Sequence, residues 1–168
     1  MATVTLRGKP LDTIGNPPNV GDTAPAFELI GNDMSPVKLS DTDGKIRIIS
    51  VVPAIDTRVC SLQTARFNHD LDSLPDSVVG YTISVDTPLA QSNWCAAKGV
   101  EKMELLSDAR GDTFGRDWGL YLQDPGFLAR SVFVVDKEGK IAYAQIVPEI
   151  SEEPDYEAAL TKAKELAV

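Results

Sequence analysis

Hydrophobic residues in this chain gather in two patterns that alternate along its length. Short runs rich in Ile and Val are typical of buried strands, and the clearest of them cover residues 46–52 and 78–85. A polar residue that can begin a helix follows each run, and an amphipathic segment comes after it. This alternation predicts strand–helix units around a central sheet. Further strands are expected at residues 27–30, 37–39, 103–106, 131–135 and 141–147.

Four helices are expected, and two of them have a clear start signal. The first follows Pro53, with Asp56 or Thr57 as its N-cap. The second follows Thr87, with Pro88 in its first turn. The apolar positions expected on the first helix are Leu62, Ala65, Phe67 and Leu71. The second helix is expected to cover residues 89–98, and the other two are expected at residues 108–118 and 157–167.

The two ends of the chain add hairpins to this pattern. Residues 4–6 and 11–14 flank a Gly-Lys-Pro turn and predict an N-terminal hairpin. A Gly-containing turn joins the last two strands in a second hairpin. Residues 120–129 contain an Asp-Pro-Gly turn and are expected to form a loop. The complete order predicts an α/β protein in which a mixed central β-sheet is flanked by helices.

The composition is that of a globular protein: 168 residues, 43% hydrophobic and 24% charged. We expect one domain over residues 1–168, with residues 1–15 as a hairpin extension. The net charge of −9 argues against nucleic acid or an anionic membrane surface as a partner. No secretory signal and no stretch long enough to span a bilayer is evident, so a cytoplasmic location is expected.

Several catalytic chemistries are excluded by the residues that the chain lacks. Its only histidine, His69, falls late on a predicted helix, where a surface or capping role is expected. One histidine and two distant cysteines make a poor zinc set and offer no Ser-His-Asp system. Gly111, Gly115 and Gly119 do not follow a strand as a phosphate loop requires. We therefore expect no metal and no cofactor, and the two cysteines remain as candidates.

Cys60 is expected in or near the first turn of its helix, where unpaired backbone N–H groups and the helix dipole favour an anion. A cysteine there tends to form the nucleophilic thiolate, and Arg58 or Arg66 can add positive potential. Cys95 also lies on a helix that follows a buried strand. Helices of a parallel sheet begin at one edge, so the two thiols can be near each other. Two independent core cysteines are the alternative interpretation.

Thr57 lies one helical turn before Cys60, where its hydroxyl can bond a thiolate or a bound oxygen. A plain N-cap is the other interpretation, and the two roles are compatible. Together with Pro53 these residues form Pro53-x-x-x-Thr57-x-x-Cys60, which resembles the active-site signature of the peroxiredoxins.

Three further segments narrow the resemblance to one branch of that family. They are SVDTPLAQS before Cys95, ARSVFVVD from Ala129, and EPDYEAAL near the C-terminus. These segments are similar to the bacterial thiol peroxidases, atypical two-cysteine peroxiredoxins that form their disulfide within one subunit. The resemblance covers nearly the whole chain and implies a thioredoxin-like fold.

The resemblance also implies a role for each matching residue. Cys60 matches the peroxidatic cysteine, and Cys95 matches the resolving cysteine. Thr57 matches the threonine that bonds the thiolate and the peroxide oxygen, and Pro53 matches the proline that shields the thiolate from water. Arg130, which otherwise reads as a surface charge, matches the arginine that completes the pocket from a distant strand. The implied substrates are hydrogen peroxide and organic hydroperoxides, the implied reductant is thioredoxin, and the implied assembly is a homodimer.

The implied chemistry proceeds through a Cys60 sulfenic acid and a Cys60–Cys95 disulfide. Cysteines on separate packed helices commonly start beyond the about 7 Å between Cα atoms that a disulfide allows. We therefore expect one or both helix starts to unwind in each cycle. Two other functions remain open. A general thiol–disulfide oxidoreductase usually carries a C-x-x-C motif, which is absent here. A redox sensor or binding protein would instead present the disulfide-bonded shape to a partner.

Overall fold

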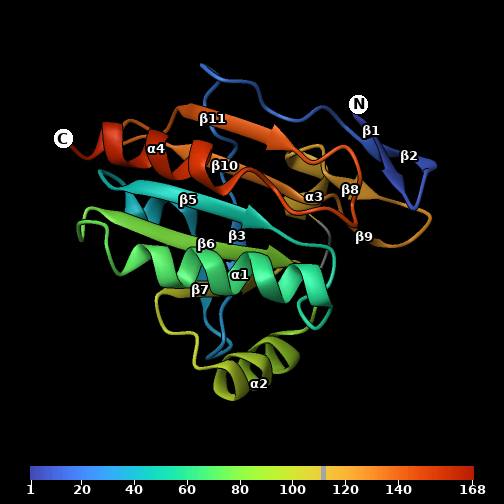
Figure 1. Ribbon diagram of the computed structural model, residues 1–168, viewed down its shortest axis with the longest axis horizontal. Coiled ribbons are helices and arrows are strands. Elements are labelled where there is room, and N and C mark those ends of the chain that lie inside the picture. Colours follow the sequence, from blue (N-terminus) through green and yellow to red (C-terminus); the bar gives the residue numbers. More distant parts are fainter. Residues whose placement is uncertain (111–112) are drawn as a thin grey trace.

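The computed structural model describes residues 1–110 and 113–168 and has a seven-stranded sheet at its centre (Figure 1). The strand order is β11-β10-β5-β6-β7-β3-β4. The neighbours β5, β6 and β7 run parallel, whereas the pairs on both sides of them are antiparallel. The predicted mixed central sheet is therefore confirmed. Its strands are β3 (Glu28–Ile30), β4 (Pro36–Lys38), β5 (Ile46–Val51), β6 (Val78–Ser84), β7 (Met103–Ser107), β10 (Ser131–Val135) and β11 (Ile141–Ile146).

A smaller sheet joins the predicted N-terminal hairpin to a second hairpin later in the chain. Its strands are β1 (Thr3–Leu6), β2 (Lys9–Ile14), β8 (Tyr121–Leu122) and β9 (Phe127–Leu128). The turn between β1 and β2 has positive φ at Arg7 (50°) and Gly8 (82°), as a two-residue type I′ hairpin requires. The expectation of a plain loop over residues 120–129 is wrong. Strands of two residues are too short to carry a period of their own, and β8 forms because β2 offers it an edge.

All four predicted α-helices are present in the described chain. They are α1 (Arg58–Leu71), α2 (Pro88–Lys98), α3 (Thr113–Asp117) and α4 (Tyr156–Leu166), and a 3-10 helix covers Leu39–Thr42. At the start of α2 the Thr87 side chain accepts a bond from the Ala90 N–H at 3.2 Å, and Gly99 ends the helix with a φ of 66°. The helix expected at residues 108–118 is shorter, because α3 begins at Thr113; residues 111 and 112 lie outside the described part.

The two faces of the large sheet bury separate apolar cores. Neighbouring residues of β5 point to opposite faces: Ile48 packs in the cluster that contains Phe67 and Leu160, and Ile49 packs in the cluster that contains Trp118. α1 and α4 cover the first face together (Figure 1). Among the described helices, none combines the length and hydropathy needed to cross a bilayer.

The buried face of α1 differs from the one that its apolar residues predict. Leu62 is 43% exposed and Ala65 is also exposed, so the expectation that they face the core is wrong. The buried residues of this helix are Cys60, Gln63, Thr64, Phe67 and Leu71. They follow the helical period from Cys60, but two of them are polar, so the pattern of apolar residues does not reveal this face. Each has a partner: the Thr64 hydroxyl donates to the Cys60 carbonyl at 3.0 Å, and Gln63 belongs to the site described below.

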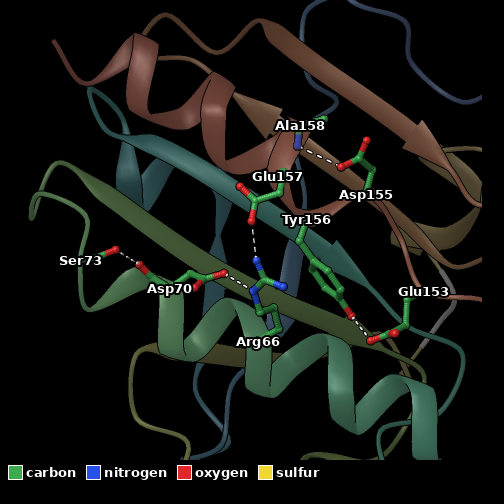
Figure 2. A network of polar contacts seen from close by, with 8 residues as sticks. All are labelled: Arg66, Asp70, Ser73, Glu153, Asp155, Tyr156, Glu157 and Ala158. Atoms are coloured by element: carbon green, nitrogen blue, oxygen red, sulfur yellow. Dashed lines mark hydrogen bonds and ion pairs between the residues drawn. The ribbon is translucent and has the colours of Figure 1, made fainter.

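A polar network joins α1 to α4 and uses one of the two arginines proposed to act near Cys60 (Figure 2). Arg66 donates to Asp70 at 2.6 Å and to Glu157 of α4 at 2.7 Å, and its guanidinium carbon lies 4.9 Å from the centroid of the Tyr156 ring. Arg58 is exposed. None of the hydrogen bonds found in the described chain joins either arginine to the Cys60 sulfur, so the positive charge at that sulfur has another source.

Candidate active site

Cys60 is the third residue of α1 and has no exposed surface. The chain reaches it from the central strand β5, which ends at Val51, through a short loop that contains the buried Pro53. Thr57 precedes the helix in an extended conformation, with φ −101° and ψ 158°. The thiol therefore lies in the first turn of α1, where the backbone N–H groups that have no partner within the helix favour an anion.

Arg130 supplies the positive charge at this thiol. Its Nη2 lies 3.3 Å from the Cys60 sulfur, and the whole side chain is buried. The register of the sheet explains this approach, because Ser131 of β10 pairs with Val51, the last residue of β5. Arg130 precedes Ser131 and thus lies beside the loop that leads from β5 to Cys60.

Two other acceptors hold the Arg130 guanidinium. Nη1 donates to Gln63 Oε1 at 3.0 Å, and Nε donates to the carbonyl of Ile150 at 2.7 Å. Gln63 is itself fixed, because its Nε2 donates to Ser50 Oγ at 2.7 Å. None of the ion pairs in the described chain involves Arg130, so its charge is directed to the sulfur rather than to a carboxylate.

Gln63 was not among the residues expected from the sequence. Its position in the sequence could have indicated a place near the thiol, because it follows Cys60 by three residues and therefore shares its helix face. The Ile150 carbonyl had no sequence signal at all, because every residue carries such a group.

The Thr57 hydroxyl makes a different bond from the one its spacing predicts. It donates to the Ala54 carbonyl at 2.8 Å and makes no side-chain cap bond to the helix. Thr57 is the N-cap by position, as expected, but the structure does not join its hydroxyl to the Cys60 sulfur in any hydrogen bond of the described residues. The bond to Ala54 uses the hydroxyl proton and leaves the oxygen able to accept another donor.

The loop before Cys60 is tied to neighbouring elements on two sides. The N–H of Ile55 donates to Asp86 Oδ2 at 2.7 Å, two residues beyond the end of β6. The carbonyl of Ile55 accepts a bond from Ser61 Oγ at 3.0 Å, and Ser61 Oγ accepts one from Trp94 Nε1 at 3.1 Å. Trp94 belongs to α2, so a chain of two hydrogen bonds connects α2 to the loop that carries Thr57.

Cys95 is the eighth residue of α2 and is partly buried. Its sulfur lies 3.6 Å from Asn32 Nδ2 in the turn between β3 and β4. Burial raises the pKa of the Cys95 thiol, and the Asn32 bond offsets part of that rise. Both cysteines are free, and Cys95 packs against the apolar cluster that contains Cys60. The start of α2 lies at the expected edge of the sheet, whereas Cys95 lies about two helical turns further along the helix.

The described residues offer no other nucleophilic or metal-binding centre of comparable quality. They contain no group of three or more His, Cys, Asp and Glu residues that could hold a metal ion, and His69 is exposed. A hollow of about 700 Å³ lies between β3 and α3, but neither cysteine lines it. A buried thiol beside an arginine that pairs with none of the carboxylates in the described ranges is arranged for nucleophilic attack on an electrophile that gains negative charge.

Comparisons with known proteins point to the same chemistry. The family model described as Redoxin matches residues 19–160. A thiol peroxidase of Listeria innocua is 48% identical over 164 residues, which cover 98% of this chain and 99% of the relative. A thiol peroxidase of Bacillus subtilis is 46% identical over 166 residues, with 99% of both chains covered.

A solved structure of a peroxiredoxin-like protein from Aquifex aeolicus superposes with a TM-score of 0.93 at 35% identity and covers 99% of this chain and 98% of its own. A thiol peroxidase from Chromobacterium violaceum has a TM-score of 0.88 at 21% identity, which supports the fold alone.

Proposed function

The chain belongs to the Redoxin family and is a thiol-dependent peroxidase with a thioredoxin-like fold, and from this premise we propose that Cys60 reduces hydroperoxides and Cys95 resolves the product. The observation that carries the proposal is the position of Arg130, whose Nη2 lies 3.3 Å from the Cys60 sulfur. This guanidinium has no carboxylate partner within the described chain, so it stabilises negative charge at the sulfur and at the oxygen that leaves.

In the first step the Cys60 thiolate attacks one oxygen of the hydroperoxide. The S–O bond forms as the O–O bond breaks, the sulfur is oxidised to a sulfenic acid, and the alkoxide or hydroxide leaves with a proton as alcohol or water. Arg130 and the first backbone N–H groups of α1 face the charge as it moves from sulfur to oxygen. Thr57 accepts a hydrogen bond from the peroxide O–H, because its own proton is given to Ala54. Pro53, which is buried before the loop, keeps bulk water from the thiolate.

In the second step the Cys95 thiolate attacks the sulfenic sulfur, and hydroxide leaves as water after it takes up a proton. The resulting disulfide needs Cα atoms within about 7 Å of each other. Cys95 lies in the interior of α2, so we expect α2 to unwind over most of its length, and not only at its start. The helix is suited to this, because Gln91 and Trp94 are its only buried residues and Leu89 is 66% exposed.

An external dithiol then returns both cysteines to the thiol state by disulfide exchange. We propose thioredoxin as this dithiol, the cytoplasm as the compartment, and a homodimer as the assembly. Neither a general thiol–disulfide oxidoreductase nor a pure sensor is favoured by a specific feature of the site.

A single-turnover experiment tests this function. Reduced protein is mixed with one equivalent of hydrogen peroxide while Trp fluorescence and free thiols are followed by stopped flow. Fast loss of both thiols, without a crosslinked dimer on a non-reducing gel, is the expected result. Cys60→Ser should abolish peroxide consumption, and Cys95→Ser should allow one turnover and then stall with thioredoxin as reductant. Thiols that survive the peroxide in the parent protein would contradict the proposal.

A further inference from the structure

Arg130 is held from behind by a carbonyl in the loop that follows β11. Its Nε bond to the Ile150 carbonyl, at 2.7 Å, is the shortest of its three side-chain hydrogen bonds. Ile150 is 3% exposed. A planar guanidinium that is bonded through Nε has its direction fixed by that acceptor. The position of the Ile150 carbonyl therefore decides whether Nη2 meets the Cys60 sulfur.

The N-terminal hairpin holds Ile150 in place. The Ile150 N–H donates to the Thr5 carbonyl at 2.8 Å, and the Thr5 N–H donates to the Pro148 carbonyl at 2.7 Å. These bonds form a short parallel bridge between Thr5 and Glu149, where the loop after β11 passes β1 (Figure 1). The hairpin is more than a hundred residues away in the sequence, yet one backbone hydrogen bond joins its Thr5 to Ile150, whose carbonyl accepts from Arg130.

The Glu149 carboxylate fastens this contact. Oε1 accepts bonds from Thr5 Oγ1 and the Gly8 N–H, both at 2.9 Å. Oε2 accepts bonds from the Ser151 N–H at 2.9 Å and from Ser151 Oγ at 2.6 Å. The bonds from Ser151, together with those from Gly8 and Thr5, hold the pKa of Glu149 well below its usual range. The carboxylate is therefore charged and turned toward the hairpin, although it belongs to the residue next to Ile150.

We propose that Glu149 is a positioning residue for the peroxide step, which fastens the hairpin to Ile150 so that the Ile150 carbonyl holds Arg130 against Cys60. This inference rests on the proposed function, because it takes Cys60 as the reacting thiol and Arg130 as its donor. It also explains why no carboxylate of this loop neutralises the arginine beside the sulfur. Arg130 donates to the neutral Ile150 carbonyl, while the adjacent Glu149 carboxylate accepts from four donors of Thr5, Gly8 and Ser151.

The test compares variants of the full chain in the reaction of reduced protein with hydrogen peroxide. Glu149→Gln keeps the shape of the side chain but places an amide among the donors. Glu152→Ala is the matched control, because Glu152 is exposed and lies in the same loop. We expect Glu149→Gln to lower the second-order rate of Cys60 oxidation about tenfold, since small misplacements of a positioned group can cost up to about a hundredfold. The control should keep the parent rate, and the later disulfide step should be unchanged in both.

A double-mutant cycle separates positioning from a general loss of structure. If Glu149 acts through Arg130, Glu149→Gln has no further effect on the rate in an Arg130→Ala background. An equal slowing in both backgrounds would overturn the inference. Thr5→Val removes one donor to Glu149 and keeps a β-branched residue in β1, so it carries the test if Glu149→Gln does not fold. We expect Thr5→Val to slow the peroxide step, and the parent rate in that variant would overturn the inference.

The same variants distinguish an error in the role of Arg130 from an error in the role of Glu149. If Arg130→Ala oxidises at the parent rate, the proposed role of Arg130 is wrong and the inference falls with it. If Arg130→Ala is slow but Glu149→Gln matches Glu152→Ala, the peroxidase mechanism stands and only the positioning role of Glu149 is wrong.

Discussion

Arg130, the residue just before β10, reaches the Cys60 sulfur at 3.3 Å, although seventy residues separate the two along the chain. The antiparallel register of β10 and β5 brings the two residues to the same end of the sheet. Through this contact, a buried thiol lies beside a guanidinium that pairs with no carboxylate of the described chain.

Removal of the guanidinium should slow the peroxide step. We expect Arg130→Ala to lower the second-order rate by about a hundredfold or more, the usual loss when a positioned donor to a developing anion is removed. Stopped-flow Trp fluorescence measures the rate. Arg58→Ala is the control, because it removes the same charge from an exposed position of α1. Equal rates in the two variants would contradict the role given to Arg130.

Gln63 should matter for both stability and rate. Gln63→Ala leaves Arg130 Nη1 and Ser50 Oγ without their amide partner inside the core. An unpaired buried polar group costs about 1–3 kcal/mol, so the free energy of unfolding should fall by this order. The peroxide rate should fall as well. Urea denaturation and single-turnover kinetics check the two effects, and the exposed Ala65→Ser on the same helix should change neither.

The bond between Trp94 and Ser61 should restrain the unwinding of α2. Trp94→Phe removes the N–H donor to Ser61 Oγ, a bond worth about 1 kcal/mol, or about fivefold in an opening equilibrium. We therefore expect disulfide formation to become about fivefold faster, while the first oxidation changes little. Quenched alkylation and mass spectrometry follow each thiol without the Trp signal. Leu89→Ala on the exposed side of α2 is the control, and an unchanged disulfide rate in Trp94→Phe would show that this bond does not restrain α2.

The reactivity of Cys95 should rise steeply with pH. Burial raises its pKa above the ordinary value of about 8.5, so the thiol form predominates at neutral pH. In a Cys60→Ser variant, alkylation of Cys95 by iodoacetamide should increase about tenfold per pH unit up to that raised pKa. Asn32→Ala removes the bond that favours the thiolate and should shift this profile to still higher pH. A plateau below pH 8 in the folded protein would contradict the assignment.

Glu149 should contribute to stability only where it is ionised. Its pKa in the folded protein is lowered by the bonds from Ser151, Gly8 and Thr5, so its contribution is complete above the unfolded value of about 4.3 and is lost as the pH falls toward the lowered pKa. The difference in the free energy of unfolding between the parent and Glu149→Gln should therefore be largest near neutral pH and shrink below pH 4.3. Urea denaturation over this pH range measures it, and a difference that grows on acidification would refute the assigned sign.

The elements of this fold were predictable where local pattern decides them. The β-branched runs became β5 and β6, and the Thr87–Pro88 start and the Gly99 stop bound α2. The N-terminal hairpin is also present, but its turn lies at Arg7 and Gly8, and the expected turn residues Lys9 and Pro10 belong to β2. Prediction was wrong where a neighbour decides the structure. β8 and β9 have too few residues to show a period. The inner face of α1 contains the polar Gln63, which can be buried because Ser50 and Arg130 satisfy its hydrogen bonds.

The sequence by itself determined which residue is the nucleophile candidate and why. Cys60 is placed in a first helical turn by a strand, a proline and an N-cap threonine, all within fourteen residues of it, and the signature Pro53-x-x-x-Thr57-x-x-Cys60 is equally local. The family resemblance singled out Arg130, but the tertiary structure alone decided which contacts surround the thiol. Arg130, Gln63 and the Ile150 carbonyl converge from three separate segments. Sheet register and backbone carbonyls set this convergence, and neither has a signature in the order of side chains.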